Sequence, residues 1–350
     1  MRVIPPIQIR DGLVSASSLV EVAPAFVLGA TYALGAVASI GPVGSLQTVY
    51  RSLQAGNQGH APESSPAWWQ AIGTTYSVYL ASATYAKGAR VIDVASHCVY
   101  ESQKDGNTGE SLVLGTAWLL VGPTNYWAPF DRLRNTQAVS PVDISYTLVP
   151  GVRTTSIAVI GLDARSVTIT VTSAGVEVYS VTLQLSTRKS RRWSEYYFGE
   201  FSTRKSIQLY NLPPYRNAQI TVTVSKPSGL RAVGGIVIGN SVYLGETQYR
   251  PTSDHLNFSV IERDPFGNIK LEPRRSVPKV REEIWFDKAL TRRIMDVREL
   301  LNGVPAIWSG LDDYTDDYFD PLFIYGPHKE FSLNLAETTH GVISLEVEEL

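Results

Sequence analysis

Residues 30–122 contain one pattern written twice. The first copy opens with ATYALGAV at Ala30 and the second with ATYAKGAR at Ala83. The later landmarks recur in the same order, and the matched pairs are Tyr32 and Tyr85, Gly35 and Gly88, Tyr50 and Tyr100, Ser52 and Ser102, Trp69 and Trp118, and Gly73 and Gly122. A repeat of this kind, roughly 45 residues long, indicates a duplicated structural module.

Each copy is predicted to be a small β unit. In the second copy the strand-like runs 89–94 and 97–101 are separated by Ala95 and Ser96. The loop at 106–109 carries glycines, which accept positive φ angles at little cost. A module this short has a small apolar core, so it depends on aromatic residues, which bury a large area per side chain.

These landmarks resemble the small chitin- and cellulose-binding modules of bacterial chitinases. The shared features are an opening Tyr with a Gly three residues later, a central V-Y-E/R-S, a G-N-x-G loop and a closing W-x-x-x-G. In that family, exposed rings stack on the C–H faces of sugars, and polar loop groups bond the hydroxyls. The resemblance therefore implies saccharide binding by five residues, which are Trp68, Trp69, Tyr85, Tyr100 and Trp118.

The same rings have a second interpretation as the core of each module, because burial is the default use of aromatic residues in small domains. Trp68 and Trp69 are adjacent, and alternation along a strand points one of them outward. We predict that Trp68 is the exposed ring, because it has no counterpart in the second copy. Exposure of Trp68, Tyr79 and Tyr126 would favour saccharide binding, whereas burial between subunits would favour assembly.

The chain has 350 residues, enough for two or three domains, and its 44% hydrophobic and 18% charged content is that of a folded protein. The net charge of −2 argues against a nucleic-acid partner. The single cysteine, Cys98, excludes an internal disulfide and a cysteine-rich zinc site. The N-terminus lacks an apolar signal segment, so we expect folding in the cytoplasm. Glycines and prolines in the uncharged stretch 22–50 argue against a membrane helix.

The predicted fold is mainly β and has five parts. Residues 1–22 form an extended N-terminal arm, and residues 23–75 and 76–126 form the two small tandem β modules. Residues 127–253 contain at least six alternating runs, a pattern typical of a β-sandwich and similar to galactose-binding jelly rolls. Residues 254–350 are predicted to be an α+β assembly domain, with a helix at 287–302 and strands at 306–308, 322–325, 331–335 and 343–347.

A basic insert at 187–206 and an acidic loop at 312–320 differ from the rest of the chain in charge. Their charged candidates are Arg188, Lys189, Arg191 and Arg192 in the insert, and Asp312, Asp313, Asp316 and Asp317 in the loop. Opposite charges favour a contact between subunits, or between the insert and an anionic partner. The alternatives are a nucleic-acid surface or a polar turn for the insert, and a solvated loop or a cation site for the acids.

Three further signatures accompany the duplication: GPTNYWAPFD, NLPPYRNAQITVTV, and a C-terminal set of GVPAIWSG, IYGPHKEFSLNL and SLEVEEL. Together they resemble tail-associated virion proteins of tailed bacteriophages. The resemblance implies a structural component of the tail, in its tip, baseplate or fibre-attachment region. It also implies assembly in the host cytoplasm, with other copies and other tail proteins, and contact with host-surface saccharide.

Catalytic motifs are absent from the sequence. It contains no glycine-rich phosphate loop, G-x-S-x-G elbow or H-E-x-x-H pair, and its five histidines are scattered. Glu101 and Asp105 lie near the second module's rings, but so small a module offers no cleft for glycoside hydrolysis. We therefore expect no enzyme, cofactor, metal or nucleic-acid partner. Two alternatives to a tail component stay open: a receptor-binding adhesin whose modules bind glycan, and a carbohydrate-binding accessory of a glycan-degrading system.

Overall fold

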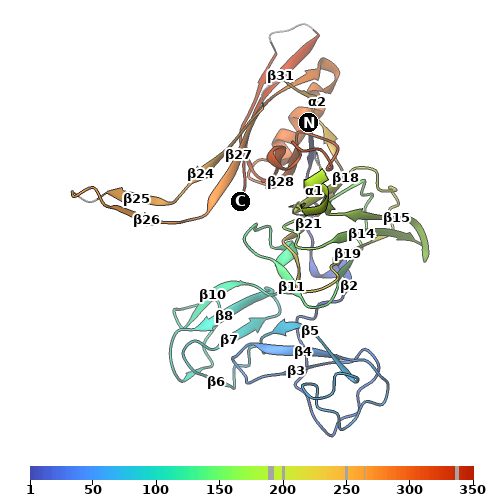
Figure 1. Ribbon diagram of the computed structural model, residues 1–350, viewed down its shortest axis with the longest axis vertical. Coiled ribbons are helices and arrows are strands. Elements are labelled where there is room, and N and C mark those ends of the chain that lie inside the picture. The colour runs from blue at the N-terminus through green and yellow to red at the C-terminus, as the bar shows by residue number, and fades with distance from the viewer. Residues whose placement is uncertain (188–192, 199–201, 249–250, 264, 336–338) are drawn as a thin grey trace.

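The computed structural model describes the chain except for residues 188–192, 199–201, 249–250, 264 and 336–338. Strands account for 47% of the residues and helices for 8%, so the prediction of a mainly β protein is confirmed. Figure 1 shows two small sheets at the bottom, a larger group of strands in the middle, and a long C-terminal sheet at the top with a hairpin projecting to the left.

Two three-stranded antiparallel sheets occupy the stretch that carries the sequence repeat. The first has the order β3 (Val37–Ile40), β4 (Gln47–Ser52), β5 (Trp69–Thr75), and the second the order β7 (Arg90–Asp93), β8 (Cys98–Ser102), β10 (Trp118–Pro123). In each sheet the register shifts once against the last strand, immediately before Gly73 or Gly122. The pairing of Tyr32 with Asn57 is matched by that of β6 (Thr84–Tyr85) with β9 (Asn107–Thr108).

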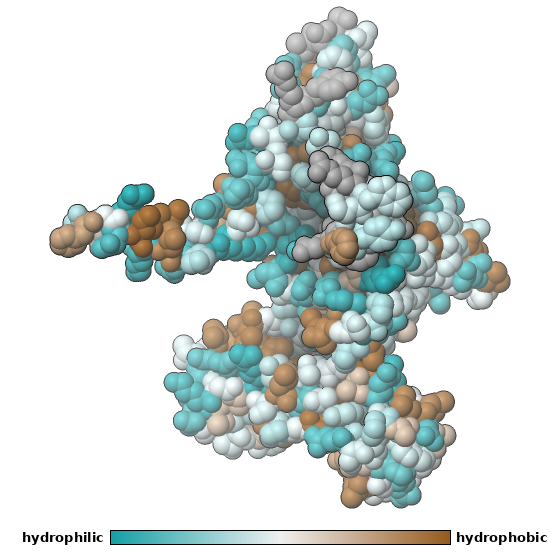
Figure 2. Space-filling view, viewed as in Figure 1, coloured by the Kyte–Doolittle hydropathy of each residue, from teal (hydrophilic) through white to brown (hydrophobic). Residues whose placement is uncertain are grey.

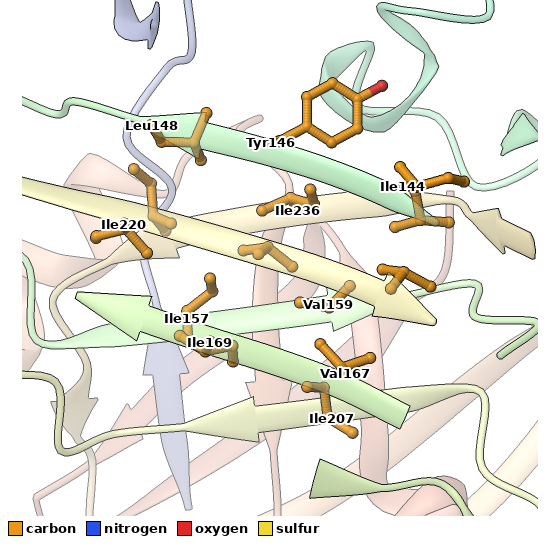
Figure 3. Close-up of a cluster of buried hydrophobic side chains, with 14 of the residues drawn as sticks. Ile144, Tyr146, Leu148, Ile157, Val159, Val167, Ile169, Ile207, Ile220 and Ile236 are labelled. Carbon is orange, nitrogen blue, oxygen red and sulfur yellow. The ribbon is translucent and has the colours of Figure 1, made fainter. Parts of the chain in front are cut away.

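Two sheets share one core in the middle of the chain. The five-stranded sheet has the order β15 (Val176–Gln184), β14 (Ser166–Ser173), β19 (Ala218–Ser225), β12 (Ile144–Leu148), β2 (Val14–Ser17), and the three-stranded sheet the order β18 (Ser206–Leu209), β13 (Ser156–Ile160), β21 (Gly235–Gly239). Figure 3 shows their side chains meeting, among them the fully buried Tyr146, Ile157 and Ile169. Gly234 separates β21 from β20 (Arg231–Val233), which pairs with β11 (Ala138–Ser140).

Residues 1–22, predicted to be an extended arm, belong to two sheets of their own chain. β1 (Arg2–Ile4) lies between β22 (Val242–Tyr243) and β28 (Ala306–Ser309), and β28 also pairs with β29 (Phe323–Gly326). β2 pairs with β12 at the edge of the middle sheet. The segment contains two strands and the 3-10 turn η1 (Asp11–Leu13), and both strands find partners in other parts of the chain.

The C-terminal part is a sheet with α2 (Thr291–Leu300) packed against it. The strand order is β23 (Glu246–Thr247), β27 (Ser276–Asp287), β31 (His340–Glu348), β30 (His328–Asn334), and β24 (Thr252–Asn257) also pairs with β27. Ile294 and Val297 of α2 are buried in the same cluster as the sheet. The helix begins later than predicted because the Asp287 carboxylate accepts a hydrogen bond from Ala289 N at 2.8 Å, and η3 (Lys288–Leu290) is a 3-10 turn.

β25 (Val260–Arg263) and β26 (Ile269–Glu272) form the projecting hairpin, which no sequence pattern above predicted. The remaining short elements are β16 (Ser186–Thr187) with β17 (Ser202–Thr203), α1 (Trp193–Phe198), η1 (Asp11–Leu13), η2 (Ala128–Phe130) and η4 (Asp320–Leu322). Within the described part of the chain, every helix is too short or too polar to cross a membrane.

One acidic side chain is buried in the C-terminal core. Glu282 on β27 is 4% exposed, and its Oε2 accepts a hydrogen bond from Thr247 Oγ1 at 3.4 Å. Its Oε1 has no hydrogen-bond partner among the described residues. Burial raises the pKa of Glu282 to about 7, and the nearby positive amino terminus only partly opposes this rise.

We expect Glu282 to lower the free energy of unfolding as the pH rises. The folded state holds an extra proton between the ordinary value of 4.5 and the raised pKa of about 7, so stability should fall across that window. The fall should be ~3 kcal/mol, and Glu282→Gln should remove most of it. Denaturant unfolding at several pH values measures the fall, with the exposed Glu283→Gln as control. Equal pH dependence in both variants would contradict this assignment.

Candidate functional site

The rings of the second repeat form a compact cluster. Tyr85 and Trp118 meet edge to face with ring centroids 5.3 Å apart, and Tyr79 lies 5.6 Å from Trp118 and 5.9 Å from Tyr85. The Tyr85 hydroxyl accepts a hydrogen bond from Leu80 N at 2.8 Å and donates one to Leu80 O at 3.3 Å. Tyr100 is buried in the same cluster. The rings are therefore the core of this small sheet.

The first repeat builds the same cluster from Phe26, Tyr32 and Trp69. Tyr32 and Trp69 lie 4.9 Å apart edge to face, and Phe26 lies 5.8 Å from Trp69 and 5.7 Å from Tyr32. The Tyr32 hydroxyl makes the corresponding two hydrogen bonds to the backbone of Val27, at 2.8 and 3.3 Å. The two repeats thus arrange three rings and one hydroxyl in the same way.

A buried asparagine occupies the G-N-x-G loop of each repeat. Asn57 Nδ2 donates to Ser52 Oγ at 3.0 Å and to Trp68 O at 3.3 Å. Asn107 Nδ2 donates to Ser102 Oγ at 2.9 Å and to the carbonyl of the residue before Trp118 at 3.1 Å. Both asparagines are 0% exposed. We expected this polar loop to bond sugar hydroxyls, but the buried amide nitrogens bond the chain itself, and each Oδ1 is buried with no hydrogen-bond partner among the described residues. The recurrence of Ser52 and Asn57 as Ser102 and Asn107 is the sequence feature that could have indicated this contact.

Four of the five predicted saccharide contacts are core residues. Trp69 is 3%, Tyr85 2%, Tyr100 8% and Trp118 6% exposed. A ring whose faces are covered by protein cannot stack on a pyranose. The structure thus favours, for these four residues, the alternative in which they form the core.

Trp68 differs from the other four rings. It is half-buried, and its ring stacks on His60 with centroids 4.0 Å apart and planes 13° apart. The neighbouring Trp69, the first residue of β5, is buried and donates its Nε1–H to His60 O at 2.8 Å. Trp68 lies in the turn before β5, so the alternation expected along a strand does not apply to this pair. Tyr79 and Tyr126 are also half-buried, each packed against other aromatic rings. Trp68 is therefore the partly accessible member of the predicted set.

Both repeats expose aliphatic side chains, and in the first repeat they include residues of an uncharged stretch. Figure 2 shows brown patches on the lower part of the molecule, where Figure 1 places β3 to β5. Five aliphatic residues there are more than half exposed: Val27 58%, Leu28 57%, Leu34 67%, Val43 65% and Leu46 55%. The stretch 22–50 also carries no charge. Exposed apolar surface of this extent is typical of an interaction site.

A buried histidine joins the second repeat to the N-terminal segment. His97 is 7% exposed, with Nδ1 2.9 Å from Glu21 Oε2 and Nε2 3.1 Å from Asp11 Oδ1. Its ring stacks on Trp127 with centroids 4.0 Å apart, and Glu21 Oε1 also accepts from Thr124 Oγ1 at 2.6 Å. Each ring nitrogen of His97 therefore lies within hydrogen-bond distance of a carboxylate oxygen. No sequence signal linked His97 to Glu21.

The acidic loop is bonded within its own chain. Asp312 accepts from Arg2 Nε at 2.9 and 3.1 Å. Asp313 accepts two 2.7 Å hydrogen bonds from Thr315, which lower the pKa of that carboxylate. Asp316 accepts from a backbone N–H at 2.8 Å, and Asp317 is exposed. Among the described residues, no group of His, Cys, Asp or Glu could hold a metal ion.

The insert reaches this loop through Arg204, which is 8% exposed. Its guanidinium donates to the carbonyl of Tyr314 and, at 2.6 Å, to that of Thr315. The contact therefore uses backbone oxygens rather than the predicted carboxylates, and it lies within one chain. The candidates Arg188, Lys189, Arg191 and Arg192 lie outside the described residues.

We expect Asn57→Ala and Asn107→Ala to destabilise their sheets by similar amounts, because each change removes equivalent hydrogen bonds. The cost should be about 1–3 kcal/mol for each repeat. Hydrogen exchange of β4 and of β8 measures this locally. The exposed Asn135→Ala is the control and should leave exchange unchanged. Unchanged protection in β8 of Asn107→Ala would refute this role.

We expect His97→Phe to loosen the junction, because it keeps the stack on Trp127 but removes the ring nitrogens that contact Glu21 and Asp11. Loss of these buried hydrogen-bond partners should cost about 1–3 kcal/mol. Faster exchange in residues 11–22 and 94–98 would report this loss. His60→Phe is the matched control, because His60 also stacks on a tryptophan at 4.0 Å. If both variants behave alike, the carboxylate contacts do not hold the junction.

Comparisons with protein-family models, with curated proteins and with solved structures find no match for this chain. The function must therefore be inferred from the chain's own residues. The relevant features are the buried ring clusters, the His97 junction, the half-buried Trp68 and the uncovered aliphatic surface of the first repeat.

Proposed function

We propose that this protein is a structural component of a bacteriophage tail, located in the tip, baseplate or fibre-attachment region. It assembles there in several copies with other tail proteins, after synthesis in the host cytoplasm. The observation that carries the proposal is the set of exposed aliphatic side chains on the first repeat, in the stretch 22–50 that carries no charge, because contact with another protein would remove them from water. The three C-terminal and central signatures support the tail as the place of assembly.

We further propose that residues 23–75 and 76–126 are two copies of one module. The equivalent ring clusters, tyrosine hydroxyl contacts and buried asparagines support this duplication. We propose a jelly-roll-like sandwich for 127–253, supported by the core shared between its two sheets. An α+β assembly domain for 254–350 is supported by the packing of α2 on the C-terminal sheet.

In this proposal the chain packs against other tail proteins and catalyses no reaction. Most of the rings that could have bound sugar serve as core, and Asp312, Asp313 and Asp316 already bond groups of their own chain. Immunogold labelling of purified phage particles with an antibody against this chain tests the proposal. Label at one end of the tail is the expected result. Label absent from intact particles, although the chain is present in the infected cell, would refute it.

A receptor-binding adhesin is the second candidate, and the half-buried Trp68 favours it. The Trp68 and His60 rings form a stacked pair on the first repeat, and a partly accessible indole can stack on a sugar face. In this case the same tail component would also contact host-surface saccharide.

If the adhesin candidate is correct, Trp68→Ala should weaken binding of the full chain to chito-oligosaccharide by about tenfold, because one stacking contact is lost. Titration calorimetry measures the affinity. Trp285→Ala is the matched control, because Trp285 is 48% exposed and lies 5.0 Å from His340 on a different sheet. If the unmodified chain does not bind, or if both variants bind equally, saccharide contact through Trp68 is excluded for this ligand.

A further inference from the structure

Three Asp or Asn residues of this chain are followed directly by glycine. The pairs are Asp11–Gly12, Asp105–Gly106 and Asn302–Gly303, and only the third carries a side-chain amide. The carbon of an amide is open to attack by the backbone nitrogen of the next residue, whereas an ionised carboxylate resists such attack. A glycine in that next position has no Cβ to hinder the approach. Asn302 is therefore the candidate for an intramolecular reaction.

The structure holds the other two side chains in place. Asp11 Oδ1 lies 3.1 Å from Nε2 of His97, and Asp105 Oδ1 accepts a hydrogen bond from Lys87 N at 2.9 Å. The Asn302 side chain, by contrast, is exposed and makes no hydrogen bond with any described residue. Its amide is therefore free to rotate towards the main chain.

The backbone nitrogen of Gly303 is also free. Gly303 follows the end of α2 with a φ of 69°, and a Cβ added there would meet nothing within 4 Å. Both neighbouring N–H groups are bonded, since Asn302 N donates to Glu299 O at 3.3 Å and Val304 N donates to Leu301 O at 3.2 Å. The Gly303 N–H has no hydrogen-bond partner among the described residues. An unbonded nucleophile thus lies next to an unbonded amide.

We propose that Asn302 is a site of spontaneous deamidation. The Gly303 nitrogen loses its proton to solvent and forms a bond to Cγ of Asn302, and the C–N bond of the side-chain amide breaks to release ammonia. Water then opens the resulting succinimide ring at either carbonyl. One opening gives aspartate, and the other gives isoaspartate, in which the main chain runs through Cγ. The chain gains water and loses ammonia, so water is the only other reactant.

Both products change the end of α2. A carboxylate at this position is unfavourable, because the C-terminus of a helix is the negative end of its dipole. Isoaspartate also lengthens the main chain between Leu301, which is fully buried, and β28, which begins at Ala306. Because Ile294 and Val297 of α2 pack in the same cluster as Leu301, we expect faster hydrogen exchange in α2 after the reaction.

Prolonged incubation of the full chain in mildly alkaline buffer, followed by peptide mass spectrometry, tests the proposal. Asn302 should deamidate about tenfold faster than Asn135, which is also exposed but is followed by threonine. Peptides with aspartate and with isoaspartate at position 302 are both expected. Asn302→Gln is the matched variant, because its longer side chain keeps the amide but closes a ring far more slowly. Its α2 exchange should stay unchanged on incubation.

Equal rates at Asn302 and Asn135 in the folded chain would overturn the proposal. So would reaction of Asn302 only after unfolding in urea, because the folded turn would then protect the amide. If α2 exchange rises equally in the incubated unmodified chain and in incubated Asn302→Gln, the effect on the helix does not come from this site. None of these results bears on the tail role, which has its own readout in particle labelling.

Discussion

The first 22 residues hold the parts of this structure together. β1 lies between β22 and β28, with Val3 and Ile4 fully buried, and β2 pairs with β12 in the middle sheet. Glu21 then meets His97 of the second repeat, with a carboxylate oxygen 2.9 Å from the ring nitrogen. One short segment thus contributes to three separate packing regions. Each contact is long-range in sequence, so the overall arrangement depends on pairing that forms only in the folded chain.

The two small sheets show how limited size constrains function. Each sheet has three strands, too few to bury a large aliphatic core, so a cluster of aromatic rings forms a main part of each core. A ring used in this way has no free face for a ligand. Trp68 lies outside the cluster, in the turn before β5, and is half-buried.

The proposed assembly role depends on exposed aliphatic side chains. The first repeat and the hairpin both expose aliphatic side chains. The acidic loop has a different use, because Arg2 and Arg204 tie it to its own chain. Apolar surfaces of this kind suit contacts between proteins that stay together, whereas exposed charge pairs contribute little to association.

The sequence by itself determined much of the local structure: the mainly β class, the strands at the centre of the middle sheets, the last strands of the chain, the buried face of helix α2, and the recurrence of landmarks from Tyr32 to Gly122. No sequence pattern indicated the strands from β22 to β27, among them the long β27. Alternation and helical spacing depend only on residues that are close in the sequence, so they can be recognised without knowledge of the tertiary structure. Only the tertiary structure decided that Trp69, Tyr85, Tyr100 and Trp118 are buried and that Asn57 and Asn107 bond the chain. It also decided that His97 meets Glu21 and that a hairpin projects at Ile261. Burial and ion pairing depend on which distant segments lie against a residue, and no local pattern specifies that.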